Sequence, residues 1–154
     1  MQKTILEGKN LDYQIEELIR DTLYNDATMQ GYVDDRIYTD HISDIKPDDL
    51  EFPCITMHFI GGRWIGEGNE TFSFDRMELE ISTDKMVAPK KQIDEIYERI
   101  LTLLVKASTI ANDNYIIQLF PDGKPMTLSF YDEKKNRTIY KKTVFFNLVD
   151  EDIQ

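Results

Sequence analysis

The residues that could support catalysis or bind a metal are few and lie far apart along the chain. His41 lies close to Asp40 and Asp44, and His58 follows Cys54 by four positions in an apolar, strand-like stretch. Cys54 and His58 would face the same side of a strand, but two ligands do not make a metal site. A solvated loop is the simpler interpretation of His41, and burial as a small hydrophobic residue that of Cys54. We therefore predict no metal and no cofactor.

Sequence motifs of catalytic or phosphate-binding sites are absent as well. The chain has neither a glycine-rich loop ending in Gly-Lys-Ser/Thr nor a Gly-x-Ser-x-Gly elbow. A catalytic site also requires a nucleophile, a base and a charge-stabilising group within reach of one another. Because the histidines and the single cysteine offer no such set, we expect a protein that is not an enzyme.

Charge and length narrow the classes of protein further. The 154 residues carry 29 acidic and 18 basic side chains, for a net charge of −11. Such a surface repels phosphate backbones, which argues against sequence-specific nucleic-acid binding. A chain of this length fits one domain, residues 1–154, and one cysteine cannot form an internal disulfide. With no apolar run of signal or membrane-spanning length, we expect a soluble intracellular product that does not bind membranes.

The strongest candidate for contact with another protein lies in a glycine-rich stretch, residues 61–69. It holds Trp64, the single tryptophan, flanked by Arg63 and Ile65. Tryptophan and arginine are enriched where partner proteins are held. Two interpretations stay open: an exposed contact residue in the long connection of a hairpin, or a side chain that folds back to cover the edge of a sheet.

Acidic residues gather in the loop predicted for residues 39–51 and at the end of the chain. The loop holds Asp40, Asp44, Asp48, Asp49 and Glu51, and the terminal group is Asp150, Glu151 and Asp152. Runs of like charge are most often a solvated loop and a solvated tail. The second interpretation is that the loop acids bind a basic partner.

The elements that must position these residues centre on a long strand followed by a long helix. Residues 71–82 alternate apolar and polar side chains, with a change of phase at Asp75 and Arg76 that predicts a bulge. Apolar residues then recur at helical spacing from Ile93 to Leu104, after Pro89 in the first turn. A strand with one apolar face and a helix with one apolar stripe are expected to cover each other.

The remaining segments predict one more helix and further strands. A helix is expected from a cap at Asn10 to about Asn25, and strand patterns occupy residues 52–60, 115–120, 126–131 and 138–149. Helix, two strands, helix and three strands in this order require mostly antiparallel neighbours. The predicted fold class is α+β: a single domain with a mostly antiparallel sheet of about four to five strands and two main helices packed on it.

In this order of elements, the chain resembles the tail terminator, or tail completion, proteins of long-tailed bacteriophages. The resemblance is carried, in chain order, by the helical stretch Leu18–Tyr24, by Gly31–Tyr38 with its apolar-x-x-Arg-Ile-Tyr sequence, by the Pro-x-Ile strand start in Phe52–Ile55, and by the segments Phe72–Ser82, Ile93–Leu104 and Tyr140–Val149. It covers nearly the whole chain and rests mainly on layout and spacing.

This resemblance implies a structural virion protein at the head-proximal end of a tail, assembled in the host cytoplasm. The chain would form a hexameric ring on the last ring of the tail tube, stop tube growth and provide the surface to which the head is joined. Its partners would be further copies of itself, the tail tube protein, the sheath in a contractile tail, and a head-completion or connector protein. DNA would pass through the lumen without specific binding. The predicted protein interface comprises Arg63, Trp64, Ile65, Arg36, Asp48, Asp49 and Glu51.

Other functions remain open at this stage. Sheath caps of contractile particles and head-completion proteins look similar in layout. A small acidic binding module is the alternative from another class, for instance an inhibitor or a DNA mimic that uses the loop acids Asp40, Asp44, Asp48, Asp49 and Glu51 against a basic partner. In the chain, however, the acids are scattered through a well-patterned fold, whereas a mimic would need phosphate-like spacing on one face.

Overall fold

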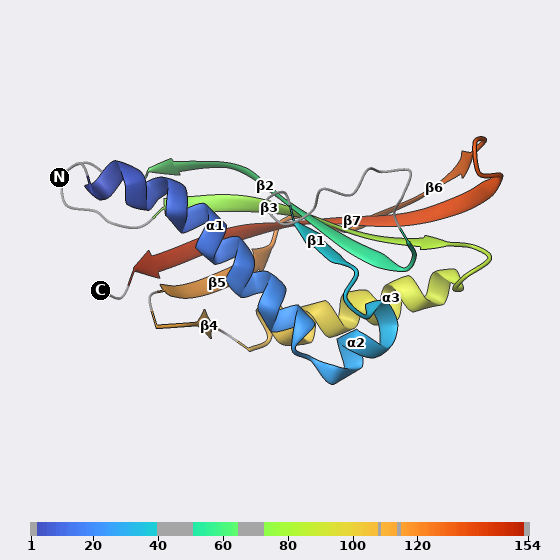
Figure 1. The fold of residues 1–154 in the computed structure, drawn as a ribbon, viewed down its shortest axis with the longest axis horizontal. Coiled ribbons are helices and arrows are strands. Elements are labelled where there is room, and N and C mark those ends of the chain that lie inside the picture. The colour runs from blue at the N-terminus through green and yellow to red at the C-terminus, as the bar shows by residue number, and fades with distance from the viewer. Residues whose placement is uncertain (1–2, 40–50, 65–72, 108, 114, 153–154) are drawn as a thin grey trace.

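The computed structural model describes residues 3–39, 51–64, 73–107, 109–113 and 115–152. These residues form three α-helices, one π-helical turn and a mixed sheet of seven strands (Figure 1). The helices lie on one side of the sheet, as Figure 1 shows. The α+β class predicted from the sequence is confirmed, with more strands than the four to five expected.

The helices are α1 (Lys3–Tyr24), α2 (Ala27–Val33) and α3 (Lys90–Ile100), and α3 continues into the π-helical turn η2 (Leu101–Val105). The expected start of the first helix at Asn10 is wrong, because α1 begins at Lys3. No proline interrupts residues 3–9, and most of them favour helix, so a capping residue inside the run does not start a new helix. The sequence indicates only a short turn through residues 27–33, and the structure shows the seven-residue helix α2 there, which is too short for a helical periodicity to stand out.

The strands are β1 (Ile37–Thr39), β2 (Cys54–Trp64), β3 (Ser73–Asp84), β4 (Ile110–Ala111), β5 (Tyr115–Pro121), β6 (Met126–Asp132) and β7 (Arg137–Asp152). Their order in the sheet is β1-β2-β3-β7-β5-β4, and β6 also pairs with β7. The β1–β2 pair is parallel and all the other pairs are antiparallel. Two of the additional strands, β1 and β4, have three and two residues, too few to show an alternating pattern.

Three other sequence expectations are corrected by the strand pairing. The bulge lies in β2 at Gly61, between Ile60 and Gly62, and not in β3, whose register with β7 is continuous. It is nevertheless opposite the predicted position, because Ile60 pairs with Arg76. Residues 61–64 belong to β2, and residues 150–152, expected as a solvated tail, belong to β7.

The hydrophobic core lies between the sheet and the helices. Buried side chains from the strands include Met57, Leu79 and Phe146, which meet Ile19 of α1 and Ile96 of α3 in one cluster. Along each strand these residues alternate with the residues of the opposite face, as a pleated strand requires. The helix-facing side of the sheet is therefore closed within the subunit.

Strand β7 is the central strand of the sheet and pairs with three others. One edge pairs with β3 from Ile139 to Val149, while the other edge pairs with β6 up to Thr143 and with β5 from Phe146 onward. The β6–β7 hairpin end rises away from the helix layer, as Figure 1 shows. We call residues 122–142, which include the turn before β6, the strand β6 and the first residues of β7, the arm.

Candidate functional site

The arm presents apolar side chains on the face of the sheet opposite the helices. Met126, Leu128 and Phe130 alternate along β6, and Phe120 of β5 lies on the same face through its pairing with Asn147. Their exposed fractions are 60%, 56%, 47% and 48%, in that order. We call these four residues the strip. Clusters of exposed large apolar side chains on one face are typical of contact surfaces.

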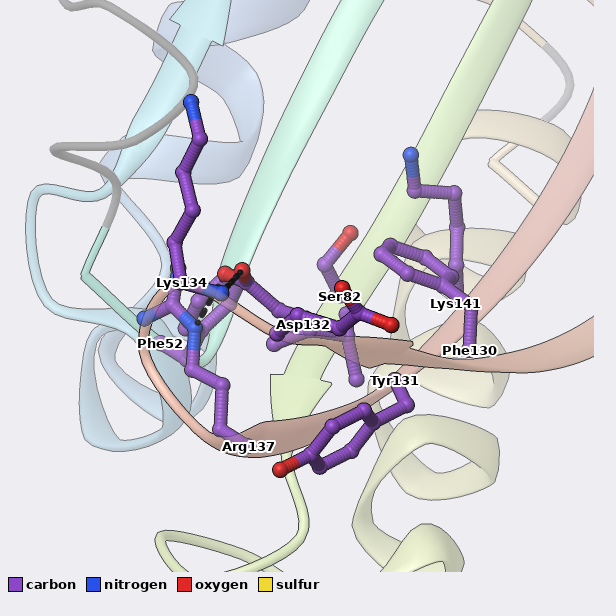
Figure 2. Close-up of a pocket in the computed structure, with 10 residues that line it drawn as sticks. Phe52, Ser82, Phe130, Tyr131, Asp132, Lys134, Arg137 and Lys141 are labelled. Carbon is purple, nitrogen blue, oxygen red and sulfur yellow. Dashed lines mark hydrogen bonds and ion pairs between the residues drawn. The ribbon is translucent and has the colours of Figure 1, made fainter.

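Beside the strip lies a hollow of about 510 Å³ at the base of the hairpin, which Figure 2 shows with its lining side chains. Four structural elements line it: the segment before β2, the end of β3, and both strands of the arm with their turn. The lining residues are Phe52, Ser82, Phe130, Tyr131, Asp132, Glu133, Lys134, Arg137, Ile139 and Lys141. Its walls combine aromatic rings with basic side chains.

Asp132 organises the hairpin turn at this hollow. Its carboxylate accepts hydrogen bonds from the backbone N–H of Lys134 at 3.1 Å, from that of Lys135 at 3.4 Å, and from Arg137 Nε at 3.1 Å. Burial acts to raise the pKa of Asp132, but these donors together with the charge of Arg137 outweigh it and lower the pKa below its usual value. The dashed lines in Figure 2 mark contacts that hold the Asp132 carboxylate inside the turn, so its role there is to stabilise the turn.

Two of the three cationic side chains that line the hollow, Arg137 and Lys141, lie over aromatic rings. Arg137 lies over the ring of Phe52 at 4.8 Å, and the ammonium of Lys141 lies 5.5 Å from the ring centre of Phe130. Lys141 Nζ also forms an ion pair with Glu80 at 3.3 Å. These contacts fix the positive charges beside the apolar strip.

The other end of the strip has a similar arrangement. Arg76 lies 4.4 Å above the ring of Phe145 and pairs with Asp122 at 3.2 Å. The backbone N–H of Asp122 donates to the carbonyl of Phe145 at 2.8 Å, which ties the turn before β6 to β7. The next residue, Gly123, has a φ of +80°, a conformation that favours glycine. The strip is thus anchored at both ends.

A second hollow, of about 450 Å³, lies between α2 and α3. Here Arg99 donates to both carboxylate oxygens of Asp26, at 2.9 and 2.5 Å, while Asp26 also caps α2 through the N–H of Met29. The hydrogen bond from Arg99 is the main cause of the lowered pKa of Asp26. On α3, Glu95 accepts a hydrogen bond from Tyr32 at 3.1 Å. These groups join two helices and are engaged with one another.

Cys54 and His58, which the sequence analysis considered for chemistry, do not line either hollow. Cys54 is buried, as predicted, and burial raises the pKa of its thiol to about 12, so the reactive thiolate is disfavoured. Within the described residues, no group of three or more histidine, cysteine, aspartate or glutamate side chains could hold a metal ion. What the arrangement around the strip offers is an apolar contact surface bordered by positive charge.

The residues predicted from the sequence as an interface fall into separate groups. Arg36 Nε donates to the Pro53 carbonyl at 2.8 Å at the start of β2, and exposed Glu51 lies nearby in the chain. Both charges act on Tyr38, whose pKa is raised mainly by burial. Arg36 therefore holds the backbone at this corner.

Arg63 and Trp64 lie at the other end of β2, roughly 30 Å away along the strand. The sequence analysis placed Trp64 in a loop, but the residue belongs to β2, where its backbone pairs with Ser73. The side chains of both residues lie outside the description, and so do Ile65, Asp48 and Asp49 altogether. The structure places Arg36 and Glu51 both near Tyr38, at the opposite end of β2 from Arg63 and Trp64.

The sequence analysis missed the strip, although it correctly predicted the last hairpin. The signal that could have revealed the strip is the set of polar and charged residues that neighbour its apolar residues. Met126, Leu128 and Phe130 alternate with polar residues, while the partner strand carries Lys141 and Lys142. Lysine side chains are rarely buried, so a hairpin with two adjacent lysines in one strand is not expected to be covered by the core on both faces.

None of the helices in the described part of the chain combines the length and apolar character needed to cross a membrane. No protein-family model matches the sequence, and no curated protein matches it. The fold is similar to that of a chain in a solved structure described as the virion of a native gene transfer agent (GTA) particle, with a TM-score of 0.57. The alignment covers 86% of this chain and 92% of that chain at 14% identity. The two chains share a fold over most of their length.

Proposed function

We propose that this protein is a structural component of a phage-like virion that caps the end of the tail tube. In this role it forms a hexameric ring, stops tube growth and provides the surface to which the head is joined. The observation that carries the proposal is the shared fold with a chain from a gene transfer agent virion, which extends over nearly the whole of both chains. The resemblance in element order to tail terminator proteins supports the finer assignment.

The features of the chain fit a protein that acts by contact and has no catalytic role. The side chains around both hollows bind one another, and the exposed strip offers apolar area to a partner. Its partners are further copies of itself, the tail tube protein, the sheath where the tail is contractile, and a head-completion protein. The net charge of −11 suits a lumen through which DNA passes without being held.

The physical basis of capping is that a tube of stacked rings presents the same growing face after every addition. Another subunit can always add unless a ring binds that face and does not reproduce it. A protein that matches the symmetry of the tube on one side and differs on the other meets this requirement. It remains in the virion, at the head-proximal end of the tail, after assembly in the host cytoplasm.

The test is deletion of the gene from the genome that encodes the particle, followed by negative-stain electron microscopy of the lysate. We expect heads filled with DNA, free tails, and tubes of variable length that extend beyond the normal one. Expression of the intact gene in trans should restore joined particles of uniform length. This control excludes an effect on neighbouring genes.

Other phenotypes would identify the alternatives. Tails of normal length beside heads that have lost their DNA would mean a head-completion protein, and normal tubes with uneven sheaths would mean a sheath cap. Normal particles in full yield would contradict a virion role and favour an acidic binding module.

A further inference from the structure

The arm and the rest of the chain have opposite charge. The arm, residues 122–142, holds six basic and three acidic side chains, for a net charge of +3. The remaining 133 residues, which we call the body, hold 12 basic and 26 acidic side chains, for a net charge of −14. Opposite charges on separate parts of one subunit allow one copy to attract another, even though the whole molecule is strongly acidic.

The strip adds apolar contact area to the same part of the molecule. Its four residues share the face of the sheet opposite the helices, and each is about half exposed or more. Lys141, which pairs with Leu128 across the hairpin, is on this face as well. A partner that covers the strip therefore meets both apolar side chains and positive charge.

The outer edge of β6 is also available. Among the described strands β6 pairs with β7 alone, so its second edge has no strand partner there. The opposite end of the sheet is different, because β1 is three residues long and Arg20 Nε donates to the carbonyl of Ile37 at 3.1 Å. Natural proteins usually cover or shorten the edges of a sheet, and β4, at the far end of the strand order, has only two residues. The seven-residue β6 is not shortened in this way.

We infer that the arm is the joint between neighbouring copies of this protein, and that its strip packs on the acidic body of the next subunit. Arm-to-arm contact is disfavoured, since it would bring two segments of charge +3 together. The contact is therefore head-to-tail, with different surfaces on the two sides. Head-to-tail contacts produce closed rings when the rotation between copies closes. The inference rests on the ring proposed above and assigns the surface that builds it.

The first test compares the self-association of purified variants by sedimentation velocity over a range of concentrations. Leu128→Asp places a negative charge in the strip, and Val87→Asp places the same charge on an apolar residue of similar exposure, 59%, outside the arm. We expect weak association of the wild-type protein, weakened at least about tenfold by Leu128→Asp and little changed by Val87→Asp. Circular dichroism checks that both variants are folded.

Either of two results would overturn the inference. One is a wild-type protein that is still monomeric at about 1 mM, and the other is equal association of the two variants with wild-type strength. A parallel comparison uses charge alone. Lys134→Glu with Lys135→Glu, in the arm, should weaken association more than Lys85→Glu with Lys91→Glu outside it, because both pairs change the net charge equally and all four residues are exposed.

The second test asks whether the contact is head-to-tail. Leu128→Asp protein is immobilised and wild-type protein is passed over it. In a head-to-tail contact the immobilised body still accepts a wild-type arm, so binding persists, whereas Leu128→Asp passed over itself does not bind. Loss of binding in both cases would mean arm-to-arm contact and would contradict the inference.

These outcomes separate the joint from the proposed function. If the arm bound the tail tube instead of another copy, Leu128→Asp would leave self-association unchanged and would weaken binding to purified tube. That result would overturn the joint and leave the capping function standing. The deletion phenotype described above tests the capping function itself.

Discussion

The two halves of β7 lie in the same strand and in opposite environments. In the second half, Val144, Phe146 and Leu148 point into the core and are buried. In the first half, Lys141 and Lys142 follow one another, and the paired strand β6 exposes its apolar residues. Both halves alternate in the same way along the chain. They differ in the face of the sheet concerned: Val144, Phe146 and Leu148 lie on the face that the helices cover, whereas the strip lies on the opposite face, where no described helix packs.

The comparison shows that a regular strand pattern serves two purposes in this molecule. Around Phe146 it stabilises the subunit by burial, at roughly 25 cal/mol for each Å² of apolar surface removed from water. In the arm it holds an apolar surface in a fixed shape without burying it. Lys142 lies at the border between the two, since it pairs with Asp94 at 2.8 Å and lies 4.6 Å from the ring centre of Tyr97 on α3.

The sharpest test of this difference is a pair of phenylalanine substitutions. Phe146→Ala removes a fully buried ring and should lower the free energy of unfolding by about 3–5 kcal/mol. Phe130→Ala removes a ring that is 47% exposed and should cost about 1 kcal/mol or less. Urea unfolding of both variants measures the two values. Equal losses would show that the arm is as much a part of the core as the second half of β7.

A smaller loss of stability is expected when the polar contact between α2 and α3 is removed. Asp26→Ala removes both the cap of α2 and the ion pair with Arg99, and should cost about 1–2 kcal/mol. Asp26→Asn keeps a capping side chain and should cost less. Asp113→Ala, at an exposed position, serves as the control for loss of a negative charge. If Asp26→Asn were as damaging as Asp26→Ala, the ion pair would outweigh the cap.

The pH dependence of stability should differ between body and arm. The pKa values of Asp26 and Asp132 both lie below 3.8, the ordinary value, in the folded protein. The unfolded chain therefore binds protons first, and the stability that each carboxylate contributes is lost as the pH falls through 3.8 and below.

Melting temperatures measured across this range should fall less steeply for Asp26→Ala than for the wild type. For Asp132→Ala we expect the loss of structure to be confined to the hairpin turn, so that NMR chemical shifts change in residues 132–137. A global destabilisation by Asp132→Ala would contradict the independence of the arm.

The smallest loss of stability is expected for substitution of Lys142, which contacts α3 from the first half of β7. Lys142→Ala removes an ion pair whose Asp94 side chain is 65% exposed, so the loss of stability should stay below about 1 kcal/mol. Chemical denaturation at low and high salt would measure it, with Lys91→Ala as a control on the same helix as Asp94. A loss of several kcal/mol would show that the arm and the helices unfold as one tightly coupled unit.

Periodicity in the sequence predicted the parts of the fold that the core determines. Buried Met77, Leu79 and Ile81 in β3, and Ile93 and Ile96 in α3, follow the predicted alternation and helical spacing. The short strands β1 and β4 escaped because two or three residues carry no period. The bulge was assigned to β3 because the apolar residues of that strand change phase, whereas the extra residue lies in its partner β2.

The candidate site could be predicted less well, for a physical reason. An alternation such as Met126, Leu128 and Phe130 looks the same whether its apolar face is buried in the same subunit or left open. The choice depends on whether another element packs on that face of the sheet, which no local pattern records. Arg36, singled out as an interface residue, holds the Pro53 carbonyl through its Nε. The roles of Trp64, Asp48 and Asp49 stay predictions.

The position of β7 also bears on how the protein is made. Strands β3, β5 and β6 all precede β7 in the chain, and each depends on it for a hydrogen-bonded neighbour. During translation, at about 5–20 residues per second, a nascent chain that lacks β7 has no closed sheet. The arm, too, has no second strand until then. A subunit therefore gains its complete sheet and its projecting hairpin together, once β7 has been made, and a chain that still lacks β7 has no arm with which to join a neighbour.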